Sequence, residues 1–134
     1  MAVQIIRKAY FNAAHRLYNP NWSDSDNFEI FGKCSYPNYH GHNYILEVSL
    51  KGEVDPETGM LINLKHVEDL IQKYVIDKLD HKNLNLDVEE FKEIIPTAEN
   101  IAIVIYNLLN PHLNNFGLQV KLHETKKNIA IYPV

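Results

Sequence analysis

The sequence contains a single cysteine and no long apolar run, and these two absences limit what the protein can be. Cys34 is the only cysteine in the chain, which excludes an internal disulfide and suits a reducing compartment. No apolar stretch approaches the ~18 residues of a membrane-spanning helix, and no charged-then-apolar segment opens the chain. We therefore expect a soluble, cytoplasmic protein that has no membrane partner.

An excess of positive charge is also missing. The chain has 13 Lys and Arg residues against 17 Asp and Glu residues, a formal net charge of -4, so it carries no overall basic field for nucleic acid. Its 46% hydrophobic and 22% charged residues exclude disordered, collagen-like and coiled-coil classes. The sequence lacks internal repeats and linkers, and its 134 residues predict one domain, 1–134.

The hydrophobic pattern predicts an α+β domain with the element order strand, strand, helix, helix, strand, strand. Apolar residues alternate with polar ones in the strand segments and recur at helical spacing in the others. Asn63 and Thr97 are expected as the helix N-caps. The predicted strands are 3–17, 41–53, 118–124 and 128–132, and the predicted helices are 63–79 and 97–109. This order favours a four-stranded antiparallel sheet with two helices on one face, whose open edges invite oligomerisation.

Residues 18–39 lack sustained periodicity. They are rich in turn-forming residues, including Pro20, Gly32 and Pro37, and they contain Cys34. A loop of this length is uncommon in a compact domain. We therefore expect a long functional loop that carries or covers a site.

Three histidines are expected to converge on one face of the sheet. His40 and His42 are two residues apart at the start of a strand, so their side chains project together. His15 shares the apolar parity of the first strand, and antiparallel pairing of the two strands would bring it beside them. Three imidazoles that leave a fourth position open suit zinc, although copper, nickel and iron also accept imidazole.

The remaining candidates each allow a plain structural interpretation. Cys34 could be a small buried hydrophobic residue, but Lys33 and the expected metal site favour a reactive thiol. Asp80 and His81 could be a solvated pair at a helix end or a catalytic pair in which Asp80 orients His81. The sequence alone leaves both alternatives open for these two residues.

Glu124 lies on an apolar parity near the end of its strand. It could reach water, or it could be a buried carboxylate that accepts hydrogen bonds from a guanidine-like edge of a ligand. Thr97 and Glu99 are explained equally well as a helix cap and a carboxylate near the positive end of a helix dipole. The remaining histidines, His66, His112 and His123, are expected to be solvated or hydrogen-bonded.

Six motifs in this order resemble the 6-pyruvoyl-tetrahydropterin synthase family, over nearly the whole chain. They are Phe11–Leu17, Cys34–Tyr44, Gly59–Leu64, Asp80–Leu84, Pro96–Asn100 and His123–Thr125. The resemblance implies the T-fold, in which three subunits close their sheets into a barrel and two trimers stack into a homohexamer with active sites at subunit interfaces. It also implies a lyase that converts 7,8-dihydroneopterin triphosphate to 6-pyruvoyl-tetrahydropterin, the tetrahydrobiopterin type of pterin biosynthesis.

The resemblance further implies a role for each candidate. His15, His40 and His42 would hold zinc, and Cys34 would be the proton-abstracting base. Asp80 and His81 would be its partners in proton transfer, and Glu124 would anchor the pterin with the help of Thr97 and Glu99. Lys33, Arg16, Lys82, Lys126 and Lys127 are the candidates for binding the triphosphate.

Two alternative functions follow from the same residues. A 6-carboxy-tetrahydropterin synthase of the deazaguanine route shares the fold and the metal ligands. However, the spacing of five residues between Cys34 and His40, and the asparagine at position 63, resemble the pattern of the pyruvoyl enzyme. Ala98 departs from the family pattern, which often has a second hydroxyl residue at this position. From another class, the chain could be a non-catalytic module that binds a pterin or a metal.

Overall fold

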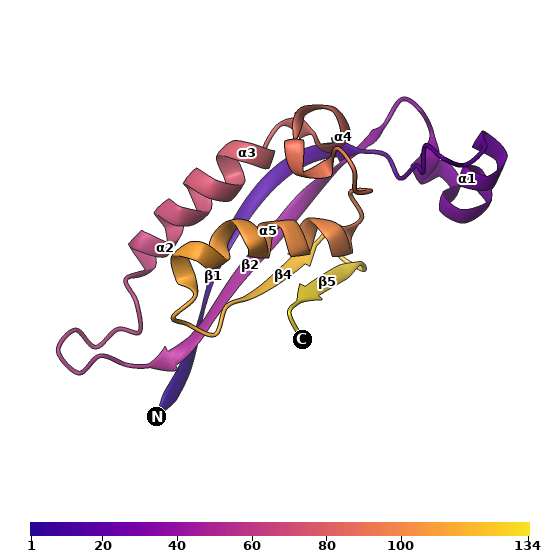
Figure 1. The fold of residues 1–134 in the computed structure, drawn as a ribbon. Helices are drawn as coiled ribbons and strands as arrows, with labels where there is room; N and C mark the ends of the chain where they lie inside the picture. Colours follow the sequence, from indigo (N-terminus) through magenta and orange to yellow (C-terminus); the bar gives the residue numbers. More distant parts are fainter.

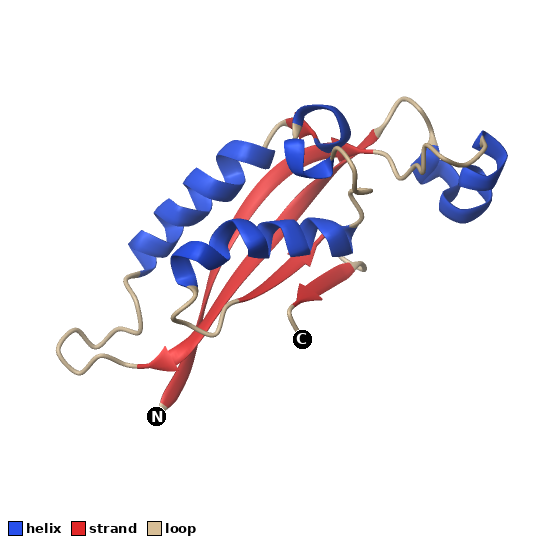
Figure 2. Ribbon diagram, in the orientation of Figure 1, coloured by secondary structure: helices blue, strands red, loops and turns tan.

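The computed structural model describes residues 1–134 and consists of a five-stranded sheet with helices on one face (Figures 1 and 2). The strands are β1 (Ala2–His15), β2 (His40–Glu53), β3 (Lys82–Asn83), β4 (Gln119–His123) and β5 (Ile129–Tyr132). The α-helices are α1 (Asp24–Phe31), α2 (Leu64–Ile71), α3 (Asp77–Leu79), α4 (Leu84–Asp87) and α5 (Ala98–Leu113). Short 3₁₀ turns cover Gly32–Ser35 and Glu89–Phe91, and a π-helical segment, Gln72–Ile76, joins α2 to α3. No helix has the length and apolar character needed to cross a bilayer.

The two long strands form the antiparallel pair that the alternating pattern predicts. Their register runs from Ala2 opposite Glu53 to His15 opposite His40, without a bulge. Because side chains alternate between faces, the apolar residues of both strands point to the same side of the sheet. Phe11 stacks on Tyr44 across this face, with ring centroids 4.8 Å apart. The register therefore fixes which side chains meet at the end of the pair.

The helices cover only this apolar face of the sheet. The continuous helical segment 64–79 contacts β1, while α5 contacts β4 and β5 (Figure 1). The predicted caps are confirmed: the Asn63 side chain accepts a hydrogen bond from the Lys65 N–H, and the Thr97 side chain accepts one from Asn100. The opposite face carries no helix, and Ile6 and Tyr10 are exposed on it.

The sheet order is β3-β1-β2-β4-β5, so the prediction of four antiparallel strands is correct for the main sheet but omits β3. Lys82 and Asn83 pair in parallel with Ala13 and Ala14 at the end of β1. The remainder of β1, residues 2–12, has no partner on this side, and β5 forms the other edge. A two-residue strand gives no alternation that a sequence pattern could reveal.

The prediction of a long loop at residues 18–39 is wrong in part, because this segment contains α1 and a 3₁₀ turn. Ser23 caps α1 by accepting a hydrogen bond from the Asp26 N–H, and Asn27 is the one buried residue of the helix. Helix α1 lies beyond the end of β1 and β2, away from the sheet and the other helices (Figure 1). It therefore has no apolar stripe facing the core, which is why helical periodicity is missing.

Candidate active site

The three predicted histidines meet where β1 ends and β2 begins. His15 is opposite His40 in the register, and His42 is opposite Ala13. The ring centroids of His15 and His40 are 4.6 Å apart, and those of His40 and His42 are 5.0 Å apart. Each residue offers one nitrogen, and these nitrogens all lie within 4.8 Å of one another. The predicted convergence of three imidazoles is confirmed, and the three residues could hold one metal ion.

The chemistry of this donor set fits a metal such as zinc. Nδ1 of the buried His15 is 2.7 Å from the carbonyl oxygen of Pro96, so a proton on Nδ1 leaves Nε2 free as a ligand. The pKa of His15 is lowered from 6.5 to about 4, mainly by burial; the hydrogen bond with the Pro96 carbonyl opposes this shift, and His40 and His42 contribute to it. Burial also lowers the pKa of His40. Neutral imidazoles are the form that binds metal.

Glu124 follows β4 directly and lies beside the histidines. Its Oε2 is 4.0 Å from Nε2 of His15, and its side chain is 16% exposed. Burial raises the pKa of Glu124, the charge of His42 opposes this effect, and Glu99 adds to it. A carboxylate held beside three imidazoles can accept hydrogen bonds from a ligand or contribute to a metal site.

A cavity of about 710 Å³ lies between the start of α5 and β5, next to this cluster. Thr97, Glu99 and Glu124 line it together with Lys127 and apolar residues of β5. Thr97, Glu99 and Glu124, which the family resemblance groups as ligand-binding residues, share this cavity. Its size and its mixture of apolar walls and a few polar groups suit a small organic ligand.

Cys34 lies in the 3₁₀ turn Gly32–Ser35, and backbone contacts tie this turn to the end of β1. The Leu17 N–H donates to the Cys34 carbonyl at 2.8 Å. The Arg16 guanidinium donates to the Ser35 carbonyl through Nε at 3.1 Å and Nη2 at 2.6 Å. The thiol is free and partly buried. The segment that carries Cys34 is therefore fixed next to the strand end that carries His15.

Asp80 and His81 lie on the outer side of β1 and contact Asn12. The Asn12 N–H donates to Oδ1 of Asp80 at 2.8 Å, and the His81 N–H donates to the Asn12 carbonyl at 2.6 Å. Oδ2 of Asp80 is 3.0 Å from Nδ1 of His81, an arrangement that orients the imidazole. The hydrogen bond from Asn12 is the main cause that lowers the pKa of Asp80. His81 is 83% exposed and has a φ of 61°.

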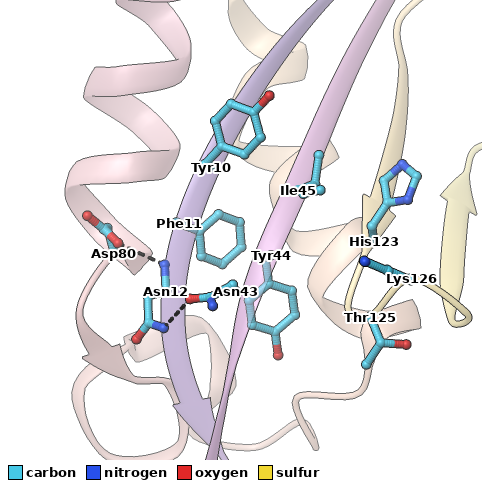
Figure 3. A pocket seen from close by; sticks show the side chains of 10 residues that line it. All are labelled: Tyr10, Phe11, Asn12, Asn43, Tyr44, Ile45, Asp80, His123, Thr125 and Lys126. Atoms are coloured by element: carbon cyan, nitrogen blue, oxygen red, sulfur yellow. Dashed lines mark hydrogen bonds between the residues drawn. The ribbon is translucent and has the colours of Figure 1, made fainter.

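The structure does not join this pair to the three histidines. No hydrogen bond or ion pair links Asp80 or His81 to His15, His40 or His42. Asp80 instead borders a second cavity, of about 720 Å³, in which Figure 3 shows Tyr10, Asn12, Asn43 and Lys126. Within one chain, the predicted residues thus form two separate groups.

Some contacts at the site could not be read from the sequence. The Pro96 carbonyl orients His15 from 81 positions away, and Asn12 holds Asp80 through backbone contacts that any residue type except proline could make.

Among the remaining histidines, Nε2 of His123 is 2.5 Å from a carboxylate oxygen of Glu47, and His112 stacks on Tyr74. Of the triphosphate candidates, Arg16 is engaged with Ser35, while Lys126 and Lys127 border the two cavities.

Comparison with known proteins gives a consistent result. The family model described as 6-pyruvoyl tetrahydropterin synthase matches residues 4–133. A 6-pyruvoyl tetrahydrobiopterin synthase from Pongo abelii is 45% identical over 96% of this chain and 90% of its own. The solved structure of Caenorhabditis elegans 6-pyruvoyl tetrahydropterin synthase has a TM-score of 0.94 at 40% identity, covering 100% of this chain and 96% of that one.

A more distant relative provides a contrast. A 6-carboxy-5,6,7,8-tetrahydropterin synthase from Rickettsia conorii is 28% identical over 92% of this chain and 94% of its own. The identity is thus much lower than with the pyruvoyl enzymes. The chain therefore belongs to the 6-pyruvoyl tetrahydropterin synthase family.

Proposed function

We propose that this protein converts 7,8-dihydroneopterin triphosphate to 6-pyruvoyl-tetrahydropterin with elimination of triphosphate. The observation that carries the proposal is the convergence of His15, His40 and His42 with Glu124 beside a cavity. The high identity to relatives named for this activity supports it. The reaction is an internal rearrangement with loss of triphosphate, so it needs no external oxidant or reductant.

The three histidines would hold zinc. When bound, zinc would polarise the hydroxyl and carbonyl oxygens of the substrate side chain and so acidify the neighbouring C–H bonds. The Pro96 carbonyl keeps His15 in one tautomer, and burial keeps it neutral. Both effects favour a metal-binding imidazole at neutral pH.

Glu124 would anchor the pterin. Its carboxylate would accept hydrogen bonds from the amino-pyrimidine edge, in which two N–H groups lie side by side. Thr97 and Glu99 would assist from the first turn of α5, since they line the same cavity. The Thr97 oxygen already accepts a hydrogen bond from Asn100, so its O–H remains available as a donor.

Cys34 would abstract a proton from the substrate side chain, and the Asp80–His81 pair would carry protons to and from the site. Asp80 is suited to orient His81, because their side chains are 3.0 Å apart. Within one chain this pair is separate from the histidine cluster. The separation supports a site at a subunit interface, in which Asp80 and His81 serve the Cys34 of a neighbouring chain.

The open sheet edges support the barrel assembly. Residues 2–12 of β1 and the β5 strand both have unpaired outer edges, and edge-to-edge pairing of three sheets would cover them. We propose a homohexamer of two stacked trimers, located in the cytoplasm, in which each chain is one domain. The helix-free sheet face would then line the barrel.

The 6-carboxy enzyme is the second candidate. It shares the histidines and the starting pterin, so the same geometry would serve it. The five residues between Cys34 and His40, and Asn63, favour the pyruvoyl product. The lower identity to the Rickettsia conorii relative supports the same choice.

Triphosphate release tests the proposal. The zinc-loaded protein is incubated with 7,8-dihydroneopterin triphosphate, with and without a chelator, and Ser25→Ala serves as a control at an exposed site on α1. We expect release that the chelator abolishes and zinc restores, and that Cys34→Ala lowers by at least about 100-fold. Pterin binding without release in the zinc-loaded wild type would instead indicate a non-catalytic binding module.

A further inference from the structure

The hydroxyl of Tyr44 is buried without a partner. Tyr44 is 1% exposed, and its hydroxyl oxygen has no hydrogen-bond partner in the protein. A buried hydroxyl that forms no hydrogen bond has lost its contacts with water and gained nothing in return. Such a group in a native fold needs a reason, and a ligand that completes its contacts is one.

Contacts on the ring of Tyr44 fix its position, so the direction in which its hydroxyl points is also fixed. The ring stacks on that of Phe11, with centroids 4.8 Å apart. It meets the rings of His15 and His42 edge-on, with centroid distances of 6.3 Å and 5.7 Å. In Figure 3 the hydroxyl points along the sheet, toward the end at which β1 finishes. This is the end that carries the histidine cluster.

Glu124 is the acidic side chain that the strand register brings beside Tyr44. Ile45 is opposite His123 in the β2–β4 ladder, so the next position along brings Tyr44 and Glu124 together on the helix face. A phenolic hydroxyl is a hydrogen-bond donor, and a carboxylate is an acceptor, so the two groups are chemically matched. The Glu124 side chain forms no hydrogen bond of its own, and His15 is 4.0 Å away.

We propose that Tyr44 is a positioning residue whose hydroxyl donates a hydrogen bond to the Glu124 carboxylate when a pterin occupies the site. This inference rests on the proposed function. A carboxylate that binds two parallel N–H groups with its outer lone pairs has further lone pairs free for a donor from the protein. A donor on that side holds the carboxylate in the orientation that the pterin edge requires.

Tyr44→Phe removes only the hydroxyl and keeps the ring that packs on Phe11. Tyr74→Phe is the matched control, because Tyr74 stacks on His112 away from the cluster. Neopterin is the probe, since it carries the pterin edge without the triphosphate, and fluorescence reports its binding to the zinc-loaded protein. We expect Tyr44→Phe to bind neopterin about 5- to 20-fold more weakly and to raise KM more than it lowers kcat.

Two further readouts separate positioning from a merely structural role. Zinc content and the thermal midpoint of Tyr44→Phe should equal or exceed those of the wild type, since the lost hydroxyl forms no bond within the protein. In a double-mutant cycle, Tyr44→Phe should weaken neopterin binding much less in a Glu124→Gln background than in the wild type. Unchanged neopterin affinity in Tyr44→Phe, or additive losses in the cycle, would overturn the inference.

A crystal structure of the wild-type protein with zinc and neopterin provides a test that needs no variant. We expect the Tyr44 hydroxyl within about 3.2 Å of a Glu124 carboxylate oxygen. A hydroxyl that remains unpaired, or that bonds to the pterin or a metal-bound group instead, would overturn the inference. Failure of the wild type to bind neopterin at all would count against the proposed function, whereas wild-type binding that Tyr44→Phe retains counts only against the role of Tyr44.

Discussion

His15 and His40 are direct partners in the β1–β2 register, and their ring centroids are 4.6 Å apart. One residue pair of a sheet thus supplies two of the three candidate ligands, and the third, His42, lies two positions further along β2. The geometry of the ligands therefore depends on the register of the sheet. Any change that shifts this register would separate them.

Metal binding should stabilise the protein measurably. Zinc at 100 times its dissociation constant should raise the free energy of unfolding by about 2.7 kcal/mol, because it binds only the folded arrangement of the three histidines. His40→Ala should lose most of this gain, while His66→Ala should keep it, since His66 is an exposed residue of α2. Urea unfolding with and without zinc measures the gain in the free energy of unfolding for each variant. Equal zinc stabilisation in the two variants would contradict the assignment of the ligands.

The stability of the metal-free protein should depend on pH through His15. Its pKa is lowered by burial from 6.5 to about 4, so between these values the unfolded chain binds more protons than the native one. The contribution of His15 is fully present above pH 6.5 and is lost as the pH falls toward 4, and it is on the order of 3 kcal/mol. Urea unfolding from pH 4 to pH 7 should show this decline in the wild type and a smaller one in His15→Gln.

Arg16 should control access to Cys34. Arg16→Gln removes the charged donors from the Ser35 carbonyl and should cost about 1–3 kcal/mol of stability. The loosened turn should also expose the thiol, so that iodoacetamide modifies Cys34 several times faster. The control is Arg7→Gln, whose ion pair with Glu68 is on the surface and worth less than about 1 kcal/mol. A modification rate that is equal in both variants would refute the role of Arg16.

Subunit mixing tests the separation of Asp80 from Cys34. Cys34→Ala and Asp80→Asn should each be nearly inactive as pure proteins, whereas Asp69→Asn, at an exposed position of α2, should be active. If neighbouring chains share a site, equal mixing after dissociation should restore about one quarter of the sites, because half of the thiols are intact and half of their neighbours supply Asp80. Mixed oligomers that stay inactive would place both residues in the same chain.

Much of the site could be predicted because it is built from strands. Alternation alone places His15, His40, His42 and Glu124 on the apolar face, and antiparallel pairing brings the first three together. Helix α1 was missed because it buries only Asn27, so no apolar stripe marks it in the sequence.

The position of Asp80 could not be predicted from the sequence either, and the reason differs from that for α1. Its main partner is the Asn12 backbone, 68 positions away in the chain, and backbone contacts leave no signature in side-chain types. The two-residue strand β3, which brings this segment to the edge of β1, is too short to show a pattern. Tertiary packing decides both features.

The mass of the product formed from 7,8-dihydroneopterin triphosphate by the zinc-loaded protein tests the proposed function most directly. We predict a product with the mass of 6-pyruvoyl-tetrahydropterin, one triphosphate released for each product molecule, and neither in the presence of a chelator. A product with the mass of 6-carboxy-tetrahydropterin, or no product with zinc bound, would contradict the assignment.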